Sequence, residues 1–192
     1  YYGNFKRHLT DISGGSRYLL TVMSSAYPGV SVVLPILNEE RDLKSSISAI
    51  LEQSYPGEFE VILALGPSTD RTNEIAKSLH ASDERVVLVD NPTGRTASGL
   101  NAAIAKAKYP IISRIDGHAE ISKDYLKRAV DIMQETGAVN VGGIMAAVGK
   151  NTFEKAVAIA MRSPLGVGAS RFHTGGSAGP ADTVYLGTFK KE

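Results

Sequence analysis

The stretch "VSVVLPILNEERDLKSSISAILEQS", residues 30–54, decides the fold class. It opens with an almost unbroken run of β-branched and aliphatic residues, which is typical of a strand covered on both faces. Pro35 stands near the end of that run, where the loss of one ladder hydrogen bond is tolerated. Asn38 is a favourable helix N-cap, and apolar residues then recur at helical spacing. The stretch therefore predicts a buried strand, a polar turn and a helix that packs back on the sheet.

The same alternation continues to the end of the chain. Further short apolar runs, each typical of a strand, are found at residues 60–65, 85–90, 110–116, 140–149 and 183–191. Helical patterns are found between them, at residues 70–80, 97–108, 122–136 and 151–161. Strands that alternate with helices in this way predict an α/β fold with a doubly wound, mainly parallel sheet.

Length and local composition suggest one main domain. The 192 residues suffice for one well-filled α/β domain or for part of a larger one. Residues 1–29 are polar and rich in glycine, so we expect a leader or packing segment there and the domain itself at residues 30–192. Because the last residues read as the middle of an element, we expect the domain to be incomplete at its C-terminus.

Charge and cysteine content exclude several classes of function. Lys plus Arg number 21 and Asp plus Glu number 20, so no basic surface for nucleic acid is indicated. The chain has no cysteine, which excludes disulfides, thiolate metal sites and cysteine nucleophiles, and which fits a reducing cytoplasm. No apolar stretch approaches the roughly 18 residues of a membrane span. We expect a cytoplasmic protein that does not bind nucleic acid.

The familiar nucleotide-binding signatures are absent or incomplete. The sequence contains no G-x-G-x-x-G. The segment "GRTASGL", residues 94–100, has the glycine spacing of a P-loop but lacks the lysine and hydroxyl residue that reach the terminal phosphates. A P-loop NTPase is therefore disfavoured.

Polar side chains follow four of the predicted strands, in "LNEE", "LGPSTD", "DNPTGRT" and "DGH". In doubly wound sheets ligands bind outside the carboxyl ends of the strands, so these four segments should line one edge. Alternation along a strand places Asp116 and His118 on the same side, where a carboxylate and an imidazole suit Mn²⁺ or, with a diphosphate, Mg²⁺. On these two residues alone, a solvated surface turn is the simpler interpretation.

Four motifs, taken in order, resemble the family 2 inverting glycosyltransferases. The family patterns are Pro-x-x-Asn-Glu, Gly-Ser-Thr-Asp, a helical Asn and Asp-x-Asp. They are matched by Pro35, Asn38 and Glu39, by Ser68, Thr69 and Asp70, by Asn101, and by Asp116-Gly117-His118. The resemblance covers about residues 30–192 and implies the Rossmann-like GT-A fold, which binds nucleotide-sugars. The Asp-x-His form and "FHTGGSAGPADTVYLGTF", residues 172–189, resemble most closely the succinoglycan-type bacterial exopolysaccharide branch.

The resemblance implies transfer of a sugar, with inversion, from a nucleotide-diphosphate sugar to a saccharide or lipid-linked saccharide. A UDP-sugar is the expected donor, assisted by Mn²⁺ or Mg²⁺ on Asp116 and His118, and Asp116 is thereby a catalytic residue. Peripheral association with the inner face of the cell membrane is implied for the full-length protein. The residues expected to bind the donor are Pro35, Leu37, Asn38, Glu39, Leu65, Gly66, Pro67, Arg95, Asn101, Arg114 and Asp116. For Arg95 and Arg114, a solvated or paired arginine is an equal alternative to a diphosphate contact.

Two departures from the family pattern leave alternatives open. The family usually carries an Asp after the second strand that bonds the uracil ring, and Leu65-Gly66 stands there instead. The family's general base is a carboxylate beyond the last strand, near a Gly-Gly-x-Asp/Glu stretch. This sequence ends at Glu192 before any such stretch, so we expect the true base to lie beyond Glu192. Asp182 is a substitute for that base, although a structural role at the start of a strand is the favoured alternative.

Two rival functions follow from these departures and from the acidic loop. A non-catalytic nucleotide-sugar-binding module is the main rival, because the uracil-binding aspartate and the general base are both missing. A nucleotidyltransferase is disfavoured, because "LNEERD" is acidic where a triphosphate would bind.

Overall fold

The structure is a computed structural model that describes residues 27–149, 151–163, 166, 173, 178–181 and 183–191. The predicted leader, residues 1–29, lies outside this part except for its last three residues. The strands are β1 (Val30–Ile36), β2 (Phe59–Leu65), β3 (Val86–Asp90), β4 (Ile111–Arg114), β5 (Asn140–Gly143) and β6 (Tyr185–Lys190). The helices are α1 (Leu43–Leu51), α2 (Thr72–Ser82), α3 (Thr96–Lys106), α4 (Tyr125–Thr136) and α5 (Thr152–Met161).

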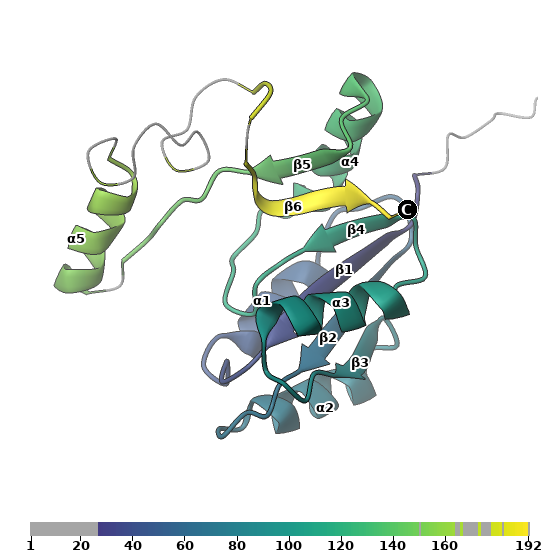
Figure 1. Cartoon of the computed structure of the whole chain (residues 1–192), viewed down its shortest axis with the longest axis vertical. Helices are drawn as coiled ribbons and strands as arrows, with labels where there is room; N and C mark the ends of the chain where they lie inside the picture. Colours follow the sequence, from purple (N-terminus) through teal and green to yellow (C-terminus); the bar gives the residue numbers. More distant parts are fainter. Residues whose placement is uncertain are drawn as a thin grey trace, which may run out of the picture.

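The strands form one sheet in the order β3-β2-β1-β4-β6-β5 (Figure 1). The pairings of β1 with β2, of β2 with β3 and of β1 with β4 are parallel. Strand β6 runs antiparallel to both of its neighbours, β4 and β5. The predicted α/β fold with a mainly parallel sheet is thus confirmed, and the carboxyl ends of β1 to β4 lie at one edge.

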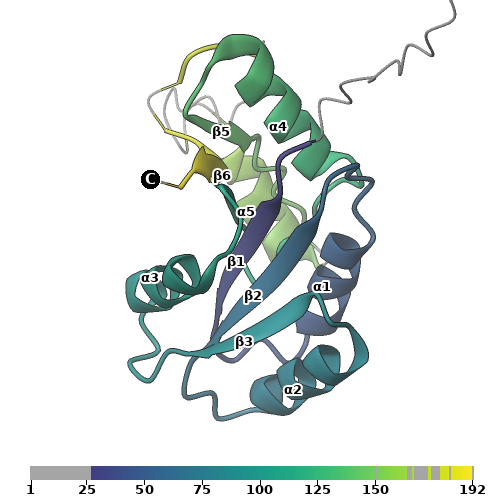
Figure 2. The same ribbon diagram turned by 90° about the vertical axis from the view of Figure 1, so that its right-hand side faces the viewer.

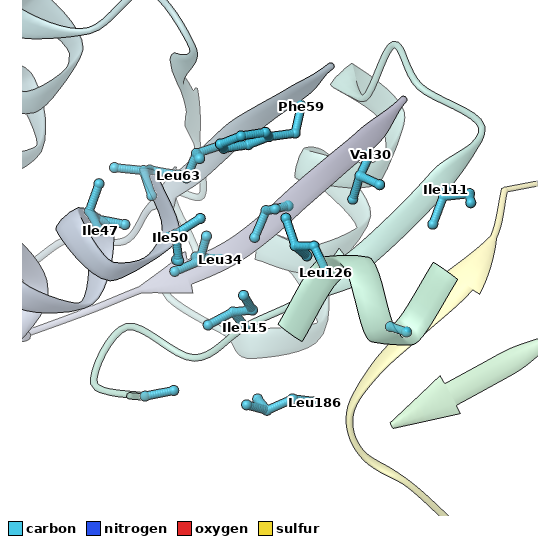
Figure 3. Packing of buried hydrophobic residues seen from close by; sticks show 14 of the residues in the cluster. Val30, Leu34, Ile47, Ile50, Phe59, Leu63, Ile111, Ile115, Leu126 and Leu186 are labelled. Carbon is cyan, nitrogen blue, oxygen red and sulfur yellow. The ribbon is translucent and has the colours of Figure 1, made fainter. Parts of the chain in front are cut away.

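Both faces of the sheet are covered, which explains the continuous apolar runs of the central strands. Figure 2 shows α3 on one side of the sheet and α1 and α2 on the other. Successive residues of β1 pack on opposite faces of the sheet. Leu34 lies in the cluster that contains Ile50 of α1 and Leu126 of α4 (Figure 3). Val33 lies in the cluster that contains Ala103 of α3. Full burial of one such aliphatic side chain contributes about 1.5–3 kcal/mol, so the helices are held by their packing.

The predicted C-terminal end of α4 and the predicted N-cap of α5 are confirmed, whereas the predicted N-cap of α1 is wrong. Helix α4 ends at Gly137, which has φ +72°, and the side chain of Asn151 caps α5 by accepting from the Glu154 backbone N–H at 2.9 Å. Helix α1 begins at Leu43, later than predicted, and Asn38 does not cap it. Asn38 instead has φ +56° and uses its side chain elsewhere, which Asn tolerates better than most residues.

Helix α5 differs from the others in its surroundings. Figure 1 shows it set apart from the sheet, and Ala158 is its one buried residue. Among the helices of the described part, none is both long enough and apolar enough to cross a membrane.

Candidate active site

The loop after β1 and the loop after β2 are joined at the carboxyl edge of the sheet. The backbone N–H of Asn38 donates to Ser68 Oγ at 3.1 Å. The side-chain oxygen of Asn38 accepts from the backbone N–H of Thr69 at 2.8 Å. The unusual backbone of Asn38 therefore serves a hydrogen-bonded contact between two residues about thirty positions apart. Asn38, expected to bind the donor, braces the edge of the site.

A second group of hydrogen bonds continues this brace. The backbone N–H of Glu39 donates to the buried Thr72 Oγ1 at 2.7 Å, and that of Glu40 donates to Asp70 Oδ2 at 3.2 Å. The Glu40 carboxylate in turn accepts from the Arg71 backbone N–H at 2.8 Å. Hydrogen bonds from Thr72 lower the pKa of Asp70, so its carboxylate is charged where it serves as an acceptor. The "PSTD" motif thus fixes the shape of the edge.

Two cavities open along this edge. The first, about 340 Å³, lies at the ends of β2 and β3 and is lined by Leu65, Gly66, Pro67, Asn73, Lys77, Asp90 and Pro92. The second, about 230 Å³, lies at the end of β1 and is lined by Pro35, Ile36, Leu37, Glu39, Asn91, Gly94 and Thr96. Six of the predicted donor-binding residues therefore line a cavity: Pro35, Leu37, Glu39, Leu65, Gly66 and Pro67.

Gly94 lies where the two cavities meet and has φ +65°. A Cβ at this position would lie 3.1 Å from Pro67 Cδ and 3.5 Å from Leu37 Cδ2. The absence of a side chain lets the loop after β3 approach the loops after β1 and β2. Leu37, whose exposed fraction is 40%, remains at the surface between the cavities as an apolar contact for a ligand.

His118 is oriented by a carboxylate from the loop after β1. Its Nδ1 lies 3.0 Å from Glu39 Oε1. Because a carboxylate oxygen accepts hydrogen bonds, this contact is satisfied by a proton on Nδ1, and Nε2 is then the ring nitrogen that a cation would use. Gly117 permits this contact, since a Cβ there would lie 3.1 Å from Glu39 Cγ. Metal-binding histidines are commonly held by a carboxylate on their second ring nitrogen, and this pair has that form.

Asp116 is paired with the predicted phosphate-binding Arg114. Nε and Nη2 of Arg114 donate to the same oxygen, Asp116 Oδ1, at 3.2 and 3.1 Å. Tyr185 of β6 lies close enough to this pair to respond to its charges. Burial raises the pKa of the Tyr185 phenol, the charge of Asp116 raises this pKa further, and Arg114 opposes the rise. Arg114 therefore neutralises Asp116 in this structure. Tyr185 was missed by sequence reasoning because it reads as one apolar residue of a strand.

The donor set around Asp116 and His118 fits a cation that a diphosphate helps to hold. Within the part of the chain that the structure describes, no group of three or more His, Cys, Asp or Glu side chains could hold a metal ion. Asp116 and His118 would supply one carboxylate and one imidazole, and diphosphate and water oxygens would supply the rest. This combination suits Mn²⁺, with Mg²⁺ as the second choice.

Five of the predicted donor-binding residues line neither cavity, namely Asn38, Arg95, Asn101, Arg114 and Asp116. Asn101 lies on the exposed side of α3, and Arg95 is exposed at the start of that helix, so neither lines a cavity. In their place the structure brings in Asn91, which sequence reasoning overlooked. It is 2% exposed and its amide donates to Arg95 O at 3.2 Å. The sequence signal for Asn91 was the polar pair Asp90-Asn91, at the point where β3 ends.

The predicted general base falls on residues that the structure does not describe. Asp182, the substitute base, lies outside the described residues, and so does Glu192, beyond which the true base was expected. The last described residue is Lys191, which directly follows β6. Both predictions of the base therefore stay predictions.

The comparison with family models decides the family. The model described as glycosyl transferase family 2 matches residues 31–187. The chain belongs to glycosyl transferase family 2. This family 2 chain is 38% identical to the succinoglycan biosynthesis protein ExoA of Rhizobium meliloti, over 75% of the chain and 44% of that protein. It is 30% identical to the glycosyltransferase AglE of Haloferax volcanii, over 63% of the chain and 40% of that protein. The chain thus spans less than half the length of these relatives.

Two solved structures share the GT-A fold with this chain. Staphylococcus aureus TarS 1-349 in complex with UDP superimposes with a TM-score of 0.57 at 23% identity, over 64% of the chain and 37% of TarS. The mannosyltransferase PcManGT of Pyrobaculum calidifontis, in complex with GDP-Man and Mn²⁺, also gives 0.57, at 26% identity, over 62% of the chain and 36% of that protein. The family 2 chain is therefore a GT-A glycosyltransferase domain.

Proposed function

We propose that this domain binds a nucleotide-diphosphate sugar across the carboxyl ends of β1 to β4 and transfers the sugar with inversion, assisted by a divalent cation. The Glu39–His118 contact of 3.0 Å beside Asp116 carries the proposal. It prepares an imidazole nitrogen for a cation at the end of β4, on the same edge as the two cavities. A surface turn, the simpler interpretation of the sequence, does not require such an oriented histidine.

The relatives support this proposal and indicate which donors and which process to expect. PcManGT, whose complex contains GDP-Man and Mn²⁺, shares the fold and is 26% identical to this chain over the aligned part. ExoA takes part in succinoglycan biosynthesis, which favours polysaccharide synthesis as the process that this domain serves. A UDP-sugar remains the expected donor, with a GDP-sugar as the alternative. The acceptor would be a saccharide or a lipid-linked saccharide, reached at the inner face of the membrane by the full-length protein.

The proposed chemistry is a single displacement. An acceptor hydroxyl attacks the anomeric carbon, the bond from that carbon to the diphosphate oxygen breaks, and its electron pair leaves with the nucleoside diphosphate. The cation, when bound, would stabilise the negative charge on this leaving group. Asp116 and His118 would hold the diphosphate end of the donor through it, and Arg114 stands beside them as a further positive charge. A carboxylate must take the proton of the acceptor hydroxyl. The predicted general base is still a carboxylate that lies beyond Glu192, and Asp182 is still its predicted substitute.

Calorimetric titration of the purified chain tests the donor site. UDP, GDP and their sugar conjugates are added in Mn²⁺ and, separately, in EDTA. The proposal expects one nucleotide to bind in Mn²⁺, with binding lost in EDTA and in Asp116→Ala. A matched control is Asp124→Ala, which removes an exposed carboxylate at the start of α4, away from both cavities. The control should bind as the unaltered chain does. Failure of every nucleotide to bind would contradict the proposal.

A non-catalytic nucleotide-sugar-binding module is the second candidate. The observation in its favour is that Leu65 ends β2 and Gly66 follows it, where the family pattern has an aspartate that contacts the base. Such a module would bind the donor in the same titration. The two functions separate when the full-length protein is given donor and acceptor, because only an enzyme releases nucleoside diphosphate in proportion to the glycoside formed.

A further inference from the structure

The cavity at the ends of β2 and β3 is built of apolar walls and a few polar groups. Leu65, Pro67 and Pro92 give it apolar surface, and the ring of each proline is rigid. Three other side chains bring polar atoms to the same cavity, namely Asn73, Lys77 and Asp90. A flat ring with a polar edge matches this combination, because its faces fit the apolar walls and its edge meets the polar groups.

Asp90 is the last residue of β3 and lies beside Leu65 in the register of the two parallel strands. Neighbouring strands are about 4.8 Å apart, and paired residues of parallel strands point to the same side of the sheet. The carboxylate of Asp90 therefore stands one strand away from the end of β2, where this chain has no polar side chain. No hydrogen bond or ion pair involves that carboxylate within the described part of the chain.

The remaining polar groups of the cavity also have unused bonding capacity. Asn73 Nδ2 donates to Gly66 O at 3.1 Å, which fixes the orientation of the amide. Asn73 Oδ1 is buried and accepts no hydrogen bond from any described residue. Lys77 is exposed and makes no ion pair with Asp90, although both line the cavity. A carboxylate and an ammonium that share a cavity without pairing are available to a ligand placed between them.

The chemistry of these groups selects one kind of ring edge. A carboxylate accepts hydrogen bonds and an ammonium donates them, so the ligand needs a ring N–H next to a carbonyl. Uracil offers this edge at N3–H and C4=O, and guanine offers it at N1–H and C6=O. Cytosine and adenine present an unprotonated ring nitrogen beside an amino group. With either of these, the lone pair of the nitrogen would face the carboxylate, and no donor would satisfy it.

We propose that Asp90, together with Lys77, determines the base of the donor, by accepting the ring N–H of uracil or guanine while Lys77 donates to the adjacent carbonyl. The inference rests on the proposed function and specifies it, since it assigns the first cavity to the base. It replaces the missing aspartate of β2 with a carboxylate from the neighbouring strand. The donor class is thereby limited to sugars whose nucleotide base carries this edge, which are UDP-sugars, GDP-sugars and, because thymine has the same edge as uracil, dTDP-sugars.

The test compares four nucleotides on the unaltered chain and on three variants. UDP, GDP, CDP and ADP are titrated calorimetrically in Mn²⁺ against the chain, Asp90→Asn, Lys77→Met and Glu84→Gln. Glu84 is an exposed residue near the amino end of β3, so its variant removes the same charge near the same strand, at the far edge of the sheet. The unaltered chain and Glu84→Gln should prefer UDP or GDP to CDP and ADP.

Asp90→Asn should weaken the preferred nucleotide by about tenfold or more, the loss typical of a hydrogen bond to a charged group. If UDP is preferred, its advantage over CDP should also shrink, because an amide can donate to cytosine N3 and accept from its amino group. Lys77→Met should weaken the same nucleotide. Nucleotide binding with an unchanged preference in Asp90→Asn would overturn this inference alone. Failure of the unaltered chain to bind any nucleotide would overturn the proposed function as well.

Discussion

Glu39 connects three parts of the site through one residue. Its backbone N–H is held by Thr72 at 2.7 Å, and its carboxylate holds His118 Nδ1 at 3.0 Å. The residue also lines the cavity at the end of β1. The position of the imidazole at the end of β4 therefore depends on a loop that follows β1. At the scale of single residues, we therefore propose that Glu39 positions His118 for the cation, while its predicted contact with the donor stays a prediction.

Glu39→Gln should reduce the affinity for Mn²⁺ in the presence of the bound nucleotide by about tenfold to a hundredfold, the usual loss when the partner of a metal-bound histidine is altered. The physical reason is that a neutral amide no longer fixes the proton of His118 on Nδ1. Free Mn²⁺ counted by electron paramagnetic resonance gives the affinity. Glu135→Gln, the same charge change at an exposed residue of α4, is the control and should leave the Mn²⁺ affinity unchanged. Equal losses in both variants would contradict the positioning role.

Gly94→Ala tests the close approach of the loops between the two cavities. Both Gly94 and Gly137 have positive φ, at +65° and +72°, so an alanine at either should lower the free energy of unfolding by about 1–2 kcal/mol. Only at Gly94 would the new methyl meet other residues, 3.1 Å from Pro67 Cδ, whereas nothing lies within 4 Å at Gly137. Nucleotide affinity should therefore fall in Gly94→Ala and persist in Gly137→Ala, as measured by titration with thermal unfolding in parallel. Identical affinities would argue against a ligand at this junction.

At the scale of elements, the loops after β1 and β2 form one hydrogen-bonded unit that shapes the carboxyl edge. Six hydrogen bonds connect residues 38–40 with residues 68–72. Backbone donors that lack a regular partner at strand ends are satisfied in this way, so the edge holds its shape without a ligand. The helices then supply the faces of the sheet, and the loops supply the site.

Thr72→Val should disturb this unit with little change of shape. It leaves the Glu39 backbone N–H without its acceptor in a buried place, which costs about 1–3 kcal/mol of unfolding free energy. Nucleotide affinity should fall as well, because Glu39 is displaced. Ser31→Ala is the control: it removes a buried hydroxyl that bonds Glu60 at 2.6 Å, and it lies toward the other edge of the sheet. It should destabilise the chain and retain affinity, as denaturant unfolding and titration would show.

The elements differ in how well local sequence foretells them. Strands such as β1 and β2 were predictable because both faces are buried and nearly every residue is therefore apolar. The start of α1 was not, because Asn38 has the local signature of an N-cap and yet its side chain bonds Thr69, which is distant in sequence. The pairing of Arg114 with Asp116 and the outward position of Asn101 likewise depend on tertiary packing. Tyr185 and Asp90 reach the site through strand register, which no local pattern encodes.

At the scale of the whole molecule, buried phenols predict how stability depends on alkaline pH. Burial raises the pKa of Tyr125 to about 12 from an ordinary value of 10.0, and its hydroxyl donates to Leu186 O, which connects α4 with β6. The phenol ionises near pH 10 in the unfolded state but only near pH 12 in the folded state. As pH rises from 10 to 12, ionisation therefore stabilises the unfolded state relative to the folded state. The free energy of unfolding should be unaffected by this group below pH 10 and should fall between pH 10 and 12. Denaturant unfolding should show a smaller alkaline fall in Tyr125→Phe, and an identical fall would contradict the assignment.

The central claim is that the donor and its cation share the carboxyl edge of the sheet. Nuclear magnetic resonance of the ¹⁵N-labelled chain tests it most directly, with UDP and GDP added first and a trace of Mn²⁺ added afterwards. The account predicts amide shifts at the residues that line the two cavities, and Mn²⁺ broadening centred on residues 116–118. The amino ends of the strands, around Ser31 and Glu60, should not respond. Shifts at those amino ends, or broadening far from Asp116 and His118, would contradict the account.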